Sequence, residues 1–133
     1  MPRSISRLIA MCALVTAGCL AGPTHTITGL VDLLDSTGAG IAITGATCTG
    51  AGASSGFSPG TPVIVGGENG TVTGSLSQGE ARSSTDCRFT FSVTGVPDSP
   101  SYEVRIGQDG GGPAEPGAEL AADNWVYSVT IGS

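Results

Sequence analysis

The chain has no lysine, a single histidine and few charged side chains of any kind. Its 133 residues include five arginines and eleven acidic residues, and charged residues make up 12% of the total. Arg3 and Arg7 lie near the N-terminus, so the part that begins at Cys19 keeps three arginines and has a net charge of about −8. Such a chain repels phosphate backbones and anionic headgroups, which excludes nucleic acid as a partner.

The shortage of basic side chains also limits the catalytic mechanisms that are open to this protein. A serine nucleophile needs a neighbouring general base, and His25, the only histidine, lies in a stretch that we expect to be a solvated spacer. Paired carboxylates can hydrolyse glycosides, but a domain of this size rarely forms the deep cleft required. The sequence therefore predicts a protein that is not an enzyme and needs no cofactor, with a small carboxylate-based hydrolase as an alternative.

No apolar run near the N-terminus is long enough to cross a bilayer. The run Leu8–Val15 is followed directly by small residues, whereas a spanning helix needs roughly 20 apolar residues. Arg3 and Arg7 precede this run, and the order of charged, apolar and small residues is that of an export signal. We expect residues 1–18 to be a signal peptide that is removed.

The sequence Leu-Val-Thr-Ala-Gly-Cys, which ends at Cys19, resembles the lipobox of bacterial lipoproteins. In that motif the cysteine thiol is acylated, and cleavage leaves the cysteine as the first residue. The resemblance implies a lipid on Cys19 that holds the protein on the extracytoplasmic face of the cell membrane, with residues 19–26 as a short tether. The alternative is an ordinary signal cut near Ala17 or Ala21, which would release a secreted protein.

Two of the four cysteines remain for the folded part. Cys12 lies in the leader and Cys19 is the expected lipidation site, which leaves Cys48 and Cys87. In an exported chain these two are expected to form a disulfide, and closing a loop of about 40 residues stabilises a fold by roughly 3 to 4 kcal/mol on the chain-entropy model. A metal or redox pair is the rival interpretation, but the chain has no Cys-x-x-Cys motif.

Short segments of alternating apolar and polar residues follow the tether, separated by clusters of Gly, Pro, Ser and Thr. In the first, Ile27, Val31 and Leu33 share one face, and the segment ends at a turn of Asp, Ser and Gly. The second segment, residues 39–48, must break or bulge at Gly45. Further along, Asn69-Gly70 predicts a tight hairpin. The remaining segments with this pattern are 61–65, 71–76, 87–97, 101–107 and 124–132.

About seven such strands predict an all-β domain over residues 27–133. The fold class is an antiparallel β-sandwich of immunoglobulin-like or prealbumin-like kind, and only 118–123 could form a turn or two of helix. Cys87 shares the apolar face of its strand, so the disulfide is expected inside the core. The predicted core comprises Val31, Phe89, Phe91, Tyr102, Val104, Trp125 and Val129.

Several of these residues resemble the pattern of the carboxypeptidase regulatory and transthyretin-like sandwich modules. Those modules have Gly-x-Val, Asp-Gly-x-Phe-x-Phe and Tyr-x-Val strands, and here Cys87 replaces the second glycine. Segments such as TPVIV, DCRFTFSVTGVP and WVYSVTIG are also similar to small exported actinobacterial proteins with two cysteines. Both resemblances imply a β-sandwich, and neither implies an activity. The matching residues are Gly29, Val31, Asp86, Phe89, Phe91, Tyr102 and Val104.

The remaining class of function is a binding or interaction module at the cell envelope. Loops of a sandwich usually carry recognition, and Phe57, a lone aromatic in a Gly/Ser-rich loop, is the candidate contact residue. The acidic segment 107–119 is a second candidate, but the spacing of Asp109, Glu115 and Glu119 matches no calcium loop, so no metal is expected. An envelope protein or a glycan is the expected partner, and a purely structural envelope role is the alternative.

Overall fold

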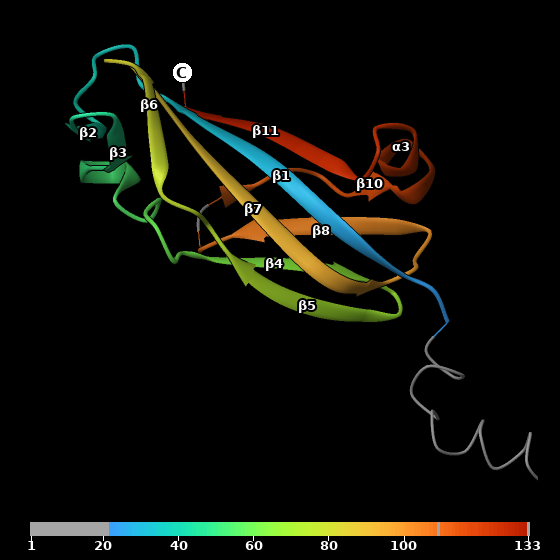
Figure 1. The fold of residues 1–133 in the computed structure, drawn as a ribbon. Helices are drawn as coiled ribbons and strands as arrows, with labels where there is room; N and C mark the ends of the chain where they lie inside the picture. The colour runs from blue at the N-terminus through green and yellow to red at the C-terminus, as the bar shows by residue number, and fades with distance from the viewer. Residues whose placement is uncertain (1–21, 109, 133) are drawn as a thin grey trace, which may run out of the picture.

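Two β-sheets pack face to face in the computed structural model, which describes residues 22–108 and 110–132 (Figure 1). The predicted β-sandwich is confirmed. The described part contains eleven strands rather than about seven, because the segment around Gly45 divides in two and short strands form in segments without a clear alternation. One short helix, α3 (Gly117–Ala122), and one 3-10 turn, η1 (Gly52–Ser54), complete the described part of the chain.

The larger sheet contains both the first and the last strand of the described residues. β1 and β11 run parallel, which departs from the predicted antiparallel arrangement, while the other neighbours in this sheet are antiparallel. The pair is parallel because the chain enters β11 from α3, at the same end of the sandwich at which β1 begins (Figure 1). In spatial order the strands are β11 (Val126–Gly132), β1 (Thr24–Leu34), β7 (Asp86–Pro97), β6 (Gly79–Ser83), β3 (Thr47–Gly50) and β2 (Ile41–Thr44).

In the smaller sheet, four strands lie side by side in one row, and a fifth, short strand pairs with one of them. β8 lies next to β4 and pairs along its other edge with β9 and β10. β5, at the opposite edge, contacts β7 of the larger sheet, so the sandwich is nearly closed on that side. The strands are β10 (Glu115–Pro116), β8 (Ser101–Ile106), β4 (Pro62–Gly67), β5 (Gly70–Ser75) and β9 (Gly110–Gly111).

Alternation along the strands places one set of side chains between the sheets. Val31 and Phe89 are fully buried, and Phe91, Tyr102 and Val104 are at most 4% exposed, so these core predictions are confirmed. Trp125 and Val129 are only partly buried and pack against the rim of the core. Further fully buried side chains are Ile27, Leu33, Val63, Val65, Cys87, Val96 and Leu120.

The tight turns form at or beside the predicted glycines, and one of them is displaced by one residue. Gly45 has a positive φ of 63° in the two-residue turn between β2 and β3, so the predicted break is a hairpin turn. The hairpin at Asn69-Gly70 is also confirmed, but Gly67 pairs with Gly70, so its turn residues are Glu68 and Asn69. The Asn69 side-chain amide instead donates to the carbonyl oxygen of Asp98, 2.7 Å away.

The turn after β1 is organised by one carboxylate. Asp35 accepts hydrogen bonds from the hydroxyl and amide of Thr37, at 2.7 and 2.9 Å, and from the amide of Gly40 at 2.6 Å. These bonds favour the ionised form, and the pKa of Asp35 is lowered, chiefly by the Thr37 hydroxyl. The Asp, Ser and Gly pattern correctly predicted this turn.

Gly29 leaves room for an aromatic ring inside the core. It pairs with Phe91 across β1 and β7, and the Phe91 ring occupies the position where a side chain on residue 29 would lie. A strand glycine covered by a cross-strand aromatic ring loses no packing. The glycine is therefore required at this position by close contact with the ring.

Gly29→Ala is expected to destabilise the domain by about 1 to 3 kcal/mol, because the added methyl group collides with the Phe91 ring and forces it out of position. Chemical denaturation of the purified chain measures the loss. Thr28→Ala, one residue away on the exposed face of β1, is the matched control and should change the free energy of unfolding by less than about 0.5 kcal/mol.

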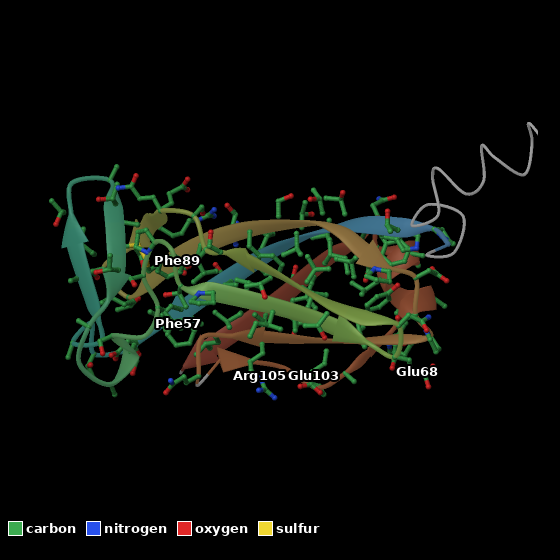
Figure 2. All side chains as sticks on the ribbon, turned by 90° about the horizontal axis from the view of Figure 1, so that it is seen from below. Phe57, Glu68, Phe89, Glu103 and Arg105 are labelled. Atoms are coloured by element: carbon green, nitrogen blue, oxygen red, sulfur yellow. A yellow bond between two sulfur atoms is a disulfide. The ribbon has the colours of Figure 1, made fainter. Side chains whose placement is uncertain are left out.

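The sandwich has two distinct ends. The start of β1, the β4–β5 turn and the β7–β8 turn lie at one end, and the β2–β3 hairpin with η1 lies at the other (Figures 1 and 2). No charged residue occurs between Asp35 and Glu68, so the β2–β3 end is formed largely by uncharged residues.

Candidate functional site

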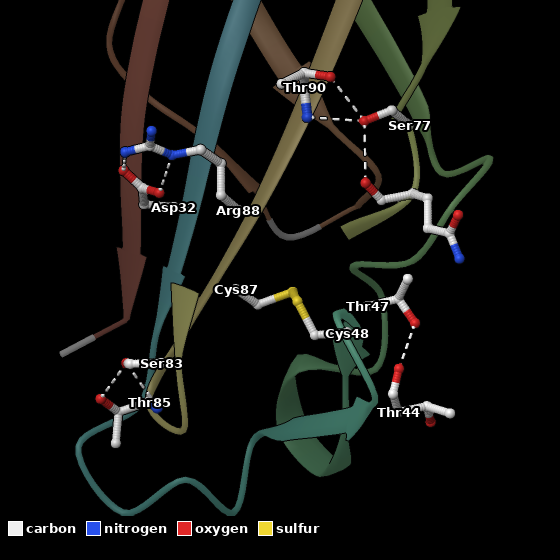
Figure 3. The surroundings of a disulfide bond; sticks show 11 residues. Asp32, Thr44, Thr47, Cys48, Ser77, Ser83, Thr85, Cys87, Arg88 and Thr90 are labelled. Atoms are coloured by element: carbon white, nitrogen blue, oxygen red, sulfur yellow. Dashed lines mark hydrogen bonds and ion pairs between the residues drawn. A yellow bond between two sulfur atoms is a disulfide. The ribbon is translucent and has the colours of Figure 1, made fainter. Parts of the chain in front are cut away.

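The Cys48–Cys87 disulfide is present and joins β3 to β7. The two Cα atoms are 5.9 Å apart, and both cysteines are nearly fully buried, as predicted for a bridge inside the core (Figure 3). β3 has only two paired positions with β6, Thr47 with Glu80 and Cys48 with Gly79. The disulfide therefore supplies much of the attachment of the β2–β3 hairpin to the rest of the sandwich.

An ion pair lies on the neighbouring strands. Arg88 of β7 donates two hydrogen bonds to the carboxylate of Asp32 in β1, at 2.8 and 3.1 Å. The bond to Asp32 is the main reason that the pKa of Arg88 is raised. Because both side chains are partly shielded from water, the pair reinforces the β1–β7 register rather than offering a free charge to a ligand.

Phe57, the predicted contact residue, is not at the surface, and that prediction is wrong. Its side chain is only 5% exposed and belongs to the core (Figure 2). The surrounding Gly/Ser loop folds back on itself: the Phe57 carbonyl accepts from the amide of Gly50 at 2.7 Å, and the Phe57 amide donates to Ser54 at 3.0 Å. The ring thereby covers the end of the core near the β2–β3 hairpin.

His25 is not a solvated spacer, which corrects a second expectation. It lies in β1, which begins at Thr24, so the folded part starts before the predicted boundary at residue 27. Its ring stacks on Trp125, with the ring centres 3.7 Å apart and the planes 14° from parallel. Its Nε2 lies 2.6 Å from a carboxylate oxygen of Asp98, and 22% of its side chain is exposed.

Trp125 is held in an unusual backbone conformation at this end of the sandwich. Asn124 and Trp125 both have positive φ angles, 58° and 62°, which are rare for residues other than glycine. The indole also meets the Tyr102 ring edge to face, with centres 5.9 Å apart. The strained turn thus places Trp125 between His25 and Tyr102.

The histidine cluster does not form a hydrolytic triad. The carboxylate contacts Nε2, and no serine or threonine hydroxyl among the described residues is hydrogen-bonded to His25. Ser99, next to Asp98, is 6% exposed and its hydroxyl lies 3.4 Å from the carbonyl of Pro97. The cluster therefore fixes the start of β1 and provides no activated nucleophile.

A polar groove runs along the outer face of the smaller sheet. It has a volume of about 430 Å³, and Gly66 and Gly67 of β4 are among its lining residues. Glu68, Glu103 and Arg105 lie along it (Figure 2). Arg105 and Glu103 form an exposed ion pair at 3.4 Å, which contributes little to stability. The other lining residues are Ile64, Thr71, Ser101 and Ala114.

A second hollow, of about 600 Å³, lies over β1 and β7. Its lining contains hydroxyl and apolar side chains and no ionisable group, so it has no residue for acid–base chemistry. The lining residues are Thr28, Gly29, Leu30, Ser75, Leu76, Ser77, Thr90, Phe91, Ser92 and Val126.

The acidic segment is not a free loop, because residues 115–122 form β10 and α3. Glu115 is partly buried, and its pKa is raised by burial first and then by the charges of Glu119 and Asp123. Asp109 lies outside the described residues. Within the described ranges, no three His, Cys, Asp or Glu side chains gather in a way that could hold a metal ion.

The predicted leader and its Cys19 lie outside the described residues. Among the helices that are described, none has the length and the apolar character that a membrane crossing requires. Comparison with protein-family models, with curated proteins and with solved structures found no match to this chain.

Proposed function

We propose that this protein is a lipid-anchored, non-catalytic binding module on the extracytoplasmic face of the cell membrane. The observation that carries the proposal is the short distance in sequence between Cys19 and the first strand. Only Leu20, Ala21, Gly22 and Pro23 separate the cysteine from β1, which begins at Thr24. Four residues reach at most about 14 Å, so a lipid on Cys19 would hold the sandwich against the membrane surface.

In this arrangement the end with His25 and the β7–β8 turn faces the membrane. The stack of His25 on Trp125 and the contact with Asp98 hold the first residues of β1 in place. An anchor at Cys19 therefore pulls on a strand that is fixed to the sandwich. The β2–β3 hairpin and the polar groove on the smaller sheet remain accessible from outside.

The scarcity of free basic groups favours binding over catalysis. The chain has no lysine, and its one histidine is already engaged with Trp125 and Asp98. The polar groove offers carboxylate, guanidinium and hydroxyl groups, which suits hydrogen bonding to an envelope protein or a glycan. Because Glu68 and Glu103 border the same groove, a carboxylate-based hydrolase is the second candidate function.

Crosslinking and affinity capture from detergent-solubilised membranes test the proposal. We expect wild-type protein to retain a partner in stoichiometric amount, and Glu103→Ala with Arg105→Ala to reduce the retained amount. Ile43→Ala, on the distant β2–β3 hairpin, is the matched control. Capture of nothing by wild-type protein would favour a structural envelope role, and release of reducing sugar from glycans would favour the hydrolase.

Cys19→Ala is expected to abolish incorporation of labelled palmitate and to move the protein from the membrane pellet to the supernatant, because multiple acyl chains are required for stable anchoring. Fractionation of cells that express either form measures the change. Cys12→Ala, in the leader, should leave both palmitate incorporation and fractionation unchanged. A Cys19→Ala protein that stays in the pellet contradicts the anchor.

A further inference from the structure

β11 forms an open edge of the larger sheet. It pairs with β1 along all seven of its residues, from Thr28 with Val126 to Leu34 with Gly132, and with no other strand in the described part of the chain. Its sequence, Val-Tyr-Ser-Val-Thr-Ile-Gly, contains no proline and no charged residue, and its register has no bulge. Proline, charged residues and bulges are the devices that usually protect an edge strand from pairing with another chain, and β11 has none of them.

The outward-facing backbone groups of this edge follow from one hydrogen bond and the parallel register. The amide of Thr28 donates to the carbonyl of Trp125, the residue before β11, at 3.0 Å. Every second residue after it, which is Tyr127, Val129 and Ile131, therefore directs its amide and carbonyl toward β1. Ser128 and Thr130 therefore direct theirs away from the sheet. Both residues are exposed, and no backbone bond to either is found among the described residues outside the β1 ladder.

The other sheet edges are less suited to adding a strand. β2 has only four residues, β10 has two and includes Pro116, and β5 lies against β7 of the opposite sheet. β11 is thus the longest edge in the described part that lacks both a covering strand and a protecting residue.

Two adjoining hollows, of about 540 and 290 Å³, follow the edge of β11. Ser128 lines both, and their opposite wall is formed by the segment that contains Glu115, Glu119 and Asp123. None of these three carboxylates takes part in the ion pairs found among the described residues. The groove beside the edge is therefore negatively charged and open to a cation.

We propose that the open edge of β11 binds an extended segment of a partner protein, which adds to the larger sheet as a further strand and directs a lysine or arginine toward Glu115, Glu119 and Asp123. Strand addition supplies main-chain hydrogen bonds to Ser128 and Thr130, and the carboxylates select the charge of the segment. This inference rests on the proposed binding function and names its partner class, but it does not depend on the lipid anchor or on the polar groove.

A second copy of this chain fits the edge less well. The uncharged strand could pair with itself, but the three arginines of the folded part, Arg82, Arg88 and Arg105, do not line either hollow. Two copies of an acidic domain would bring carboxylates to the interface without a cation to neutralise them. A partner segment that carries a lysine or arginine can pair with the backbone of β11 and also neutralise the carboxylates beside it.

The test uses the full chain, purified in detergent, and a fluorescein-labelled peptide of sequence Lys-Val-Thr-Val-Thr-Lys, acetylated and amidated. Fluorescence anisotropy should show saturable binding that weakens as salt is added. Thr130→Pro should weaken it by at least about tenfold, the equivalent of one or two hydrogen bonds. The Thr130 amide faces away from β1, so proline removes no bond within the sheet, and Thr130→Val is the matched control that keeps the amide.

Two altered peptides separate pairing from charge and do not require a folded variant. A peptide with N-methyl groups on its four central amides should not bind, because its backbone cannot pair, and one with glutamate in place of lysine should bind at least about tenfold more weakly. Equal binding of either peptide would overturn the proposal, as would undiminished binding to folded Thr130→Pro. Self-association of the chain that Thr130→Pro abolishes would assign the edge to a second copy and contradict a basic partner. Loss of peptide binding does not change the outcome of the affinity capture from solubilised membranes, so the two proposals can fail separately.

Discussion

Phe91→Ala is expected to destabilise the domain by about 3 to 5 kcal/mol, enough to unfold much of a small domain of ordinary stability at room temperature. The ring is 4% exposed and covers Gly29 on the neighbouring strand. Its removal leaves a cavity between the sheets, and Gly29 has no side chain that could fill it. Urea unfolding followed by tryptophan fluorescence measures the loss, since Trp125 is the only tryptophan.

Ile43→Ala is the matched control for this experiment. Ile43 is the exposed large hydrophobic residue of the described part, at 42%, so its truncation should change the free energy of unfolding by less than about 0.5 kcal/mol. Phe57→Ala should behave like Phe91→Ala, because Phe57 is also in the core. Equal stability of Phe91→Ala and Ile43→Ala would contradict the packing described here.

Removal of the disulfide by Cys48→Ala with Cys87→Ala is the second large effect that we expect. The bridge closes a loop with a sequence separation of 39, and opening such a loop costs roughly 3 to 4 kcal/mol on the chain-entropy model. The loss should be greatest at the β2–β3 hairpin, which has few other bonds to the sandwich. Hydrogen exchange measured by mass spectrometry should therefore show faster exchange over 41–50 than over β1 and β7.

Reduction of wild-type protein provides the control for the double variant. Under denaturing conditions, non-reduced protein should yield one linked peptide pair that contains Cys48 and Cys87, and reductant should lower the urea midpoint to that of the double variant. A midpoint that reductant does not change would show that the bridge adds no stability. Both measurements use the same chain, so differences in expression do not affect the comparison.

Most of the core could be predicted from the sequence because strand residues alternate between two environments. Val31, Phe89 and Tyr102 each stand among polar or small neighbours with the period of a half-buried strand, and all three are buried. Gly45 correctly predicted an interruption because the parity of apolar residues changes there. The disulfide followed from export and from the small number of cysteines that remained.

Phe57 and His25 could not be placed correctly because their environments depend on residues far away in the sequence. Phe57 stands in a loop without periodicity, and only the return of that loop to Gly50 buries the ring. His25 looks like part of a tether until Trp125 and Asp98, about 100 and 70 positions later, are brought beside it by the pairing of β1 with β11 and β7. No local pattern reports such contacts.

The polar groove and the open edge could not be predicted from the sequence for a similar reason. Glu68 and Thr71 belong to one hairpin, but Arg105 lies in β8 and comes beside them only after the smaller sheet has formed. Likewise, an edge strand and a central strand have the same alternation, so the sequence of β11 does not reveal which of its sides is unpaired. Sheet order is a property of the whole chain rather than of any one segment.

The parallel pairing of β1 with β11 has a consequence for the time at which the domain can fold. Thr28 and Val126 are partners, so the first strand cannot complete its pairing until nearly the whole chain has left the ribosome. Contacts of such long sequence separation raise the contact order and slow folding, because the loop must be closed before the pairing contributes any stability. This delay suits the export that we propose, since an unfolded chain passes more readily through a narrow translocation channel. The order of strands in the larger sheet thus delays completion of the fold until the last strand has been made.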